Sequence, residues 1–175
     1  QAQSRLSSTI NSNWLFCKGD TTQKAAGSNW KPVSIPHTWN TQDVLDDEPG
    51  YYRGDGWYKK TLFIPADWKD KDIYLHFEGA GQTAEVFVNG KSVGKHAGGY
   101  TFFSFPVRSF LIFAAEGNQA NELVVRVNNS HDDNLPPTMG DFNIFGGLYR
   151  DVYLNVLNHV HFDADNHATN GVFVT

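Results

Sequence analysis

Short apolar and aromatic runs recur roughly every ten residues along the chain, and Gly, Pro, Asn and Asp separate them. Ile73, Leu75 and Phe77 occupy every second position of one such run, so they share one face of an extended strand. This pattern is typical of an antiparallel sandwich or barrel. It predicts strands at 57–64, 72–78, 83–89, 92–96, 100–107, 122–128 and 148–157, with shorter ones near 14–16 and 31–35.

One turn is defined by its own residues. Asn89-Gly90 separates two short apolar segments, and this dipeptide tolerates the positive φ angles of a type I′ turn. The sequence therefore predicts a hairpin here, and single helical turns at 66–70 and 107–111.

Two long segments, 38–56 and 128–147, lack the alternation and are rich in Gly, Asp and Asn. Long loops in a compact domain are usually binding loops, so we expect the functional site there.

The last predicted strand contains a charged residue at a core position. Leu148, Arg150 and Val152 share a face, and a buried guanidinium needs a carboxylate or carbonyl partner. We therefore expect Arg150 to be buried and paired, and Asp55 to pair with either Arg150 or Arg53.

Composition narrows the class of protein. The 175 residues suit one domain, and 40% hydrophobic with 19% charged residues excludes a disordered or fibrous chain. A net charge of −5 and no basic cluster beyond Lys59-Lys60 argue against nucleic acid as a partner. The longest nearly apolar run, 110–115, is far short of the roughly 20 residues that span a bilayer.

Cysteine and histidine usage offers little chemistry. The single cysteine, Cys17, forms no internal disulfide. The seven histidines show no metal-ligand spacing, so we predict no metal site. We interpret His37 as structural. His131 with Asp133 is at most a weak cation site.

Five sequence blocks in a fixed order carry a family resemblance. They are Trp14-Leu-Phe16, Ser34-Ile-Pro-His-Thr-Trp39, Gly56-Trp-Tyr-Lys-Lys-Thr-Leu-Phe63, Val86-Phe-Val-Asn-Gly90 and Gly146-Gly-Leu-Tyr-Arg-Asp-Val-Tyr-Leu154. The set resembles the N-terminal sugar-binding domain of glycoside hydrolase family 2, a jelly-roll β-sandwich followed by an immunoglobulin-like sandwich and a (β/α)₈ barrel. The resemblance implies an extension at 1–13, the jelly roll at 14–163, and a linker with the start of the immunoglobulin-like domain at 164–175.

The resemblance also implies an activity for the parent protein. The family cleaves terminal β-glycosides with retention, using two barrel glutamates about 5 Å apart, and this chain looks most like β-galactosidases. Because the barrel is absent, we expect no catalytic residue in the segment. Asn121-Glu122 mimics the family's acid/base pair, but the core strand that follows it favours a structural role.

Four residues are the candidate sugar contacts. In the family, a loop aspartate at the position of Asp141 binds hydroxyls of the terminal sugar, and a carboxylate suits this role because charge-assisted hydrogen bonds are strong. Arg53 occupies a loop in which galactosidase-like relatives carry Asn. Phe142 and Tyr52 are the aromatic candidates, because sugar C–H faces stack on such rings. The resemblance implies that no cofactor is required and that the active site of the full-length protein can hold a monovalent or divalent cation, as some galactosidases of the family hold sodium.

Carbohydrate and the following domains of the same chain are the expected partners, with a homo-oligomer expected only of the parent. A polar start without an apolar segment suits a periplasmic or secreted protein whose signal has been removed. Two alternatives stay open at this stage: a self-standing carbohydrate-binding module, and a purely structural or partner-binding domain.

Overall fold

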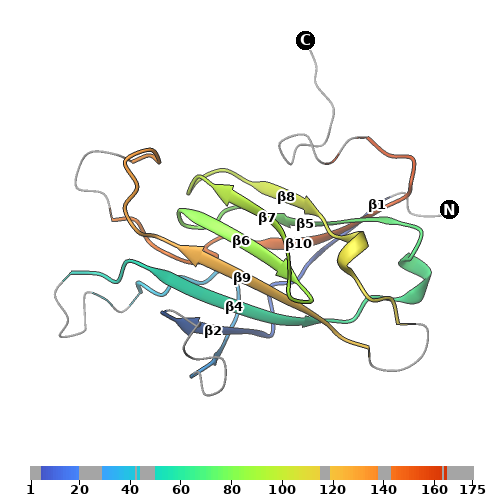
Figure 1. The fold of residues 1–175 in the computed structure, drawn as a ribbon, viewed down its shortest axis with the longest axis horizontal. Coiled ribbons are helices and arrows are strands. Elements are labelled where there is room, and N and C mark those ends of the chain that lie inside the picture. Colours follow the sequence, from blue (N-terminus) through green and yellow to red (C-terminus); the bar gives the residue numbers. More distant parts are fainter. Residues whose placement is uncertain are drawn as a thin grey trace, which may run out of the picture.

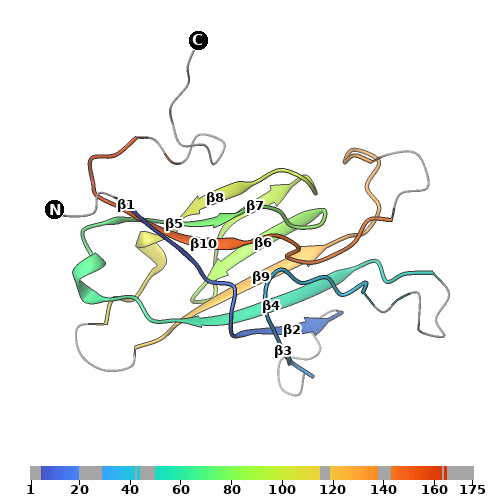
Figure 2. The same cartoon turned by 180° about the vertical axis from the view of Figure 1, so that it is seen from behind.

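The computed structural model describes residues 5–19, 29–41, 43, 50–114, 119–137, 143–162 and 164. Its strands are β1 (Arg5–Thr9), β2 (Trp14–Lys18), β3 (Lys31–Val33), β4 (Asp55–Leu62), β5 (Asp72–Phe77), β6 (Thr83–Val88), β7 (Lys91–Ala97), β8 (Phe103–Pro106), β9 (Asn121–Asn128) and β10 (Val152–Leu157). They form a four-stranded sheet, β1-β10-β5-β8, and a six-stranded sheet, β3-β2-β4-β9-β6-β7, stacked as two layers (Figure 1 and Figure 2). The predicted all-β jelly-roll sandwich is confirmed.

Each predicted strand is present, with ends shifted by a few residues. Strand β1 was not predicted from the sequence; it pairs with β10 although it lies in the stretch interpreted as an extension. Four of its five residues are exposed, so this edge strand shows no apolar alternation.

The predicted turns are confirmed. Asn89 and Gly90 have φ angles of 51° and 76°, and they join β6 to β7 as the hairpin requires. Single 3₁₀ turns occur at Ala66–Trp68 and Arg108–Phe110. Among the described residues, no helix has the length and apolar character needed to cross a membrane.

The hydrophobic core fills the space between the sheets. Strands β5 and β6 alternate strictly between half-buried and buried positions, so one face of each contributes to this core. Phe77 of β5 is fully buried and stacks on Phe103 of β8 with ring centroids 4.8 Å apart. The other large, fully buried side chains include Trp14, Tyr58, Ile64, Ile73, Leu75, Leu123 and Leu148.

The prediction that Arg150 is buried was wrong, whereas its predicted carbonyl partner is present, since its Nη1 donates to Glu78 O at 3.5 Å. Strand β10 begins only at Val152, and Gly147 before it has a φ of 129° and forms an isolated bridge to Gly81. Arg150 is therefore exposed, with its guanidinium 5.4 Å from the Tyr149 ring centroid.

The predicted partners of Asp55 were also wrong. Its Oδ1 accepts hydrogen bonds from Arg126 Nε at 3.0 Å and from Asn128 Nδ2 at 2.7 Å. Both partners lie on β9, directly beside β4, because the antiparallel register places Asp55 opposite Asn128.

Candidate functional site

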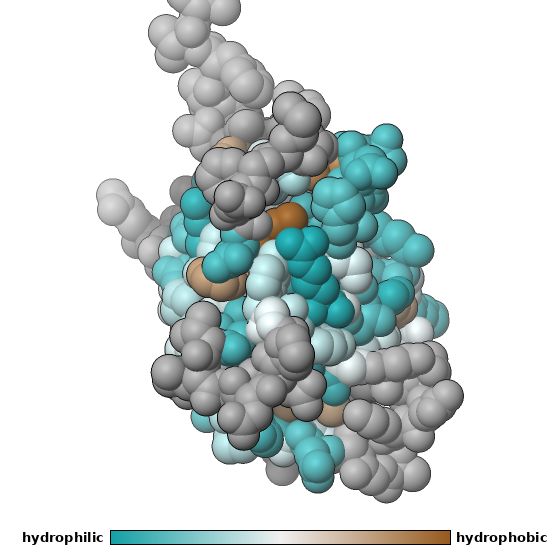
Figure 3. Space-filling view, turned by 90° about the vertical axis from the view of Figure 1, so that its left-hand side faces the viewer, coloured by the Kyte–Doolittle hydropathy of each residue, from teal (hydrophilic) through white to brown (hydrophobic). Residues whose placement is uncertain are grey.

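The two long segments selected from the sequence meet at one end of the sandwich, on the left of Figure 1. The backbone N–H of His37 donates to Leu148 O at 2.7 Å, and that of Asn129 donates to Gly54 O at 3.3 Å. Figure 3 shows this end face-on: its coloured surface is mainly hydrophilic, with isolated hydrophobic residues. We call residues 37–41, 43, 50–54, 129–137 and 143–148 the loop end.

Asn129 connects three segments of the loop end through one buried amide. Its Nδ2 donates to Tyr52 O at 3.1 Å and to Ile144 O at 2.8 Å. Its Oδ1 accepts from the Gly54 N–H at 2.9 Å. Because Asn129 is fully buried, these bonds replace water for backbone groups of two loops at once.

Asn40 and Asp43 form the other half of this network. Asn40 Oδ1 accepts from Gly146 N–H at 2.7 Å, and its Nδ2 donates to Tyr52 O at 3.0 Å and to the Asp43 carboxylate. Asp43 Oδ2 also accepts from the Tyr52 N–H at 3.0 Å. A carboxylate that is 6% exposed is thus satisfied by N–H donors.

Arg53 lies at the exposed rim and is positioned by Tyr51. Its guanidinium carbon sits 4.8 Å from the Tyr51 ring centroid, and Nη2 donates to the Tyr51 hydroxyl oxygen. The same oxygen accepts from the Ile144 N–H at 3.0 Å, so Tyr51 joins both long segments. No carboxylate of the described residues lies within ion-pair distance of Arg53.

Tyr52 is held by a hydrogen bond from its hydroxyl and by a ring contact. Its hydroxyl donates to Asp55 O at 3.1 Å, and its ring meets Trp39 edge-on with centroids 6.3 Å apart. Burial, and then the Asp55 charge, raise the pKa of the Tyr52 phenol. Tyr52 therefore supports the loops through these contacts, and Arg53 presents more polar surface to a ligand.

The other two predicted contacts, Asp141 and Phe142, lie outside the described residues. The segment that follows them is fixed by the Ile144 and Gly146 hydrogen bonds already given. Phe145 in this segment is 50% exposed and packs edge-on against Tyr51. The expected roles of Asp141 and Phe142 stay predictions.

His37 has the structural role that the sequence predicted. Its Nδ1 lies 2.7 Å from the hydroxyl of Tyr58, which is fully buried and also accepts from the Leu148 N–H at 3.3 Å. Burial lowers the pKa of His37 and raises that of Tyr58, so both are neutral near pH ~7. The pair anchors His37 to Leu148, which precedes β10.

Two glycines allow Trp39 to sit inside the loop end. A Cβ on Gly146 would lie 1.8 Å from the Trp39 ring, and one on Gly56 would lie 2.2 Å from it. Glycine at both positions is therefore a packing requirement, since no side chain fits at these distances.

The remaining sequence candidates have structural partners. The buried Asn121 amide bonds both the N–H and the carbonyl of Ile112, and Glu122 lies 3.6 Å from Lys59. His131 and Asp133 form an exposed pair at 2.8 Å. No cluster of three metal-ligating side chains occurs in the part of the chain that the structure describes.

Comparison with known proteins identifies the family. The model "Glycosyl hydrolases family 2, sugar binding domain" matches residues 7–158. A β-glucuronidase of Bacteroides fragilis is 36% identical over 94% of this chain and 23% of its own length. A β-galactosidase of Thermoanaerobacter pseudethanolicus is 35% identical over 87% of this chain and 21% of its own length. The solved Bacteroides uniformis β-glucuronidase 2, covalently bound to cyclophellitol-6-carboxylate aziridine, superposes with a TM-score of 0.84 at 42% identity, over 95% of this chain and 20% of that one.

The chain belongs to glycoside hydrolase family 2 and is its N-terminal sugar binding domain. It spans about a fifth of the length of the curated relatives that it matches. The resemblance read from the five sequence blocks is thereby confirmed.

Sequence reasoning missed Asn40, Asp43 and Asn129 as the residues that fix the loops. One signal was available for Asn129: Val125 and Val127 face the core, so the alternation of β9 continued by one step directs Asn129 inward. Asn40 and Asp43 lie in a segment without periodicity, and nothing in the sequence marks them as buried.

Proposed function

We propose that this chain braces the catalytic barrel of a retaining β-glycosidase and contributes Asp141 to the pocket that binds the terminal sugar. Family membership supports the activity, since family 2 enzymes act on β-linked sugars. The hydrolysis itself needs two carboxylates and no cofactor, and we assign those carboxylates to the part of the protein beyond this chain.

One observation carries the proposal: the Tyr51 hydroxyl accepts hydrogen bonds from both Arg53 and the Ile144 N–H. The segment directly after Asp141 is thereby joined to the loop that carries Arg53. Such anchoring suits a loop that must hold a carboxylate against a substrate, because misplacement by about 1 Å costs roughly 100-fold in rate.

The family does not determine whether the terminal sugar is a galactoside or a glucuronide. The sequence alone favoured a galactoside, whereas the relatives are named for both galactosides and glucuronides. We propose a glucuronide, because Arg53 presents a guanidinium that no carboxylate of the described residues neutralises. A uronic acid carboxylate pairs with such a group through two parallel, charge-assisted hydrogen bonds, whereas the hydroxyls of galactose offer only uncharged acceptors.

Steady-state kinetics of the full-length protein test the proposal. Asp141→Ala is expected to lower kcat/KM for nitrophenyl β-glycosides by at least roughly 100-fold, because a charge-assisted contact to the terminal sugar is lost. Asp133→Ala is the matched control, since this aspartate lies in the same long segment with its side chain 91% exposed. Unchanged kinetics for Asp141→Ala would leave the domain a purely structural role.

A further inference from the structure

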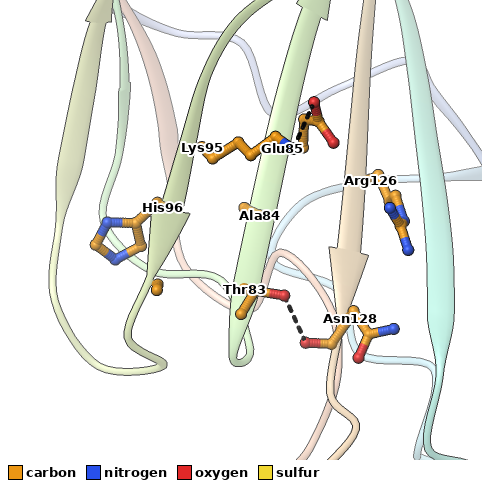
Figure 4. A pocket seen from close by; sticks show the side chains of 8 residues that line it. Thr83, Ala84, Glu85, Lys95, His96, Arg126 and Asn128 are labelled. Carbon is orange, nitrogen blue, oxygen red and sulfur yellow. Dashed lines mark hydrogen bonds and ion pairs between the residues drawn. The ribbon is translucent and has the colours of Figure 1, made fainter. Parts of the chain in front are cut away.

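The outer face of the six-stranded sheet carries a hollow of about 340 Å³ near the loop end. Figure 4 shows its lining, which comes from three neighbouring strands: Thr83, Ala84 and Glu85 of β6, Lys95, His96 and Ala97 of β7, and Arg126 and Asn128 of β9. The volume falls at the lower end of ligand pockets, which hold roughly 300–1,000 Å³. Since β7 is an edge strand, the hollow is bordered by the edge of the sheet.

The charges around the hollow alternate and cancel. Glu85 stands opposite Arg126 on one side and Lys95 on the other. Lys95 Nζ lies 3.5 Å from Glu85 Oε1, and Arg126 Nε lies 3.0 Å from Asp55 Oδ1. A face with balanced charge does not attract a polyanion, so nucleic acid and sulfated glycans are unsuitable ligands.

Hydrogen-bonding capacity is left over at these groups. Ser92 Oγ and Lys95 Nζ both approach Oε1 of Glu85, and among the described residues nothing is bonded to Oε2. Arg126 uses Nε for Asp55, which leaves the other donors of its guanidinium. Carboxylate acceptors beside guanidinium donors suit vicinal hydroxyls, which both donate and accept.

Two aromatic side chains lie beside the hollow on the same face. Trp57 and Phe87 stack with centroids 6.4 Å apart and an interplanar angle of 24°, and both are partly exposed. Trp57 pairs in register with Arg126, whose guanidinium carbon lies 5.9 Å from the indole ring. Aromatic faces next to hydrogen-bonding groups are the combination that sugar rings require.

We propose that this face binds a neutral polysaccharide, with one part of the chain in the hollow and the next against Trp57 and Phe87. The ligand runs across β7, β6, β9 and β4, which places it beside the loop end. A protein partner fits less well, because the centres of protein interfaces are depleted of charged residues, whereas this hollow is lined by them. The site does not involve Asp141, so it stands or falls apart from the proposed function.

Affinity gel electrophoresis of the full-length protein tests the site, with gels containing galactomannan, xyloglucan, arabinoxylan or mixed-linkage β-glucan. The protein is expected to be retarded by at least one of them, and Glu85→Ala to weaken that retardation by about tenfold. Glu122→Ala is the matched control: it is also a glutamate on this sheet beside a lysine, with a side chain 55% exposed.

A second variant distinguishes loss of the site from misfolding. Trp57→Ala, verified as folded by circular dichroism, should weaken retardation at least as much as Glu85→Ala does, whereas Asp141→Ala should leave it unchanged. Three results would overturn the site: no retardation in any neutral gel, retardation by dextran sulfate alone, or equal losses in Glu85→Ala and Glu122→Ala.

Discussion

Phe77 and Asn129 are both fully buried, yet different forces hold the regions around them. Phe77 lies between the two sheets, where apolar area removed from water stabilises the fold without directional bonds. Asn129 lies at the loop end, where its amide makes directed hydrogen bonds to Gly54, Tyr52 and Ile144. The interior therefore sets how stable the domain is, and the loop end sets where the candidate sugar contacts lie.

The largest effect is expected from a cavity in the interior. Phe77→Ala should lower the free energy of unfolding by about 3–5 kcal/mol, because a fully buried ring is lost and its space is only partly refilled. Urea denaturation of the 175-residue chain measures this. The kcat/KM of the folded full-length protein should stay near wild type, and a large drop in it would show that the two regions are not separable.

Asn129→Ala should lower the free energy of unfolding by about 3 kcal/mol, since it leaves buried backbone groups of both long segments without partners. Unlike Phe77→Ala, it should also lower kcat/KM at temperatures where the protein is fully folded. Loss of stability with unchanged catalysis would mean that the network does not position the sugar contacts.

Arg53→Gln tests whether one side chain of the loop end selects the terminal sugar. The ratio of kcat/KM for a glucuronide to that for a galactoside should fall about tenfold, or about 1.4 kcal/mol, because an exposed ion pair with the uronate is lost. Lys91→Gln, which removes an exposed cation in the hairpin, serves as the control. An equal fall for both substrates would assign Arg53 to loop positioning and not to sugar choice.

The smallest expected effect is a change in the free energy of unfolding with pH. Burial lowers the pKa of His37, and likewise those of His76 and His96. The unfolded chain then binds more protons than the folded one, so the free energy of unfolding should fall as pH drops below the ordinary histidine value of about 6.5. Urea denaturation at several pH values should show a shallower fall for His37→Gln, and equal slopes would contradict the assignment.

The fold was predictable because apolar and polar residues alternate along a strand wherever one of its faces is buried and the other is exposed. Strand β1 escaped prediction because nearly all of its residues are exposed, and Arg150 was misassigned because Gly147 interrupts the strand before β10. The candidate sugar contacts were inferred from the family resemblance and stay predictions. The buried network around Asn40 and Asp43 was not predictable, because contacts between distant loops leave no local pattern.

A crystal structure of the full-length protein with a trapped glycosyl intermediate tests the central claim most directly. We predict a carboxylate oxygen of Asp141 at about 2.6–3.2 Å from a hydroxyl of the bound sugar, with Tyr51 still joining Arg53 to Ile144. An Asp141 side chain that points into solvent, with the sugar held only by other domains, would contradict the account.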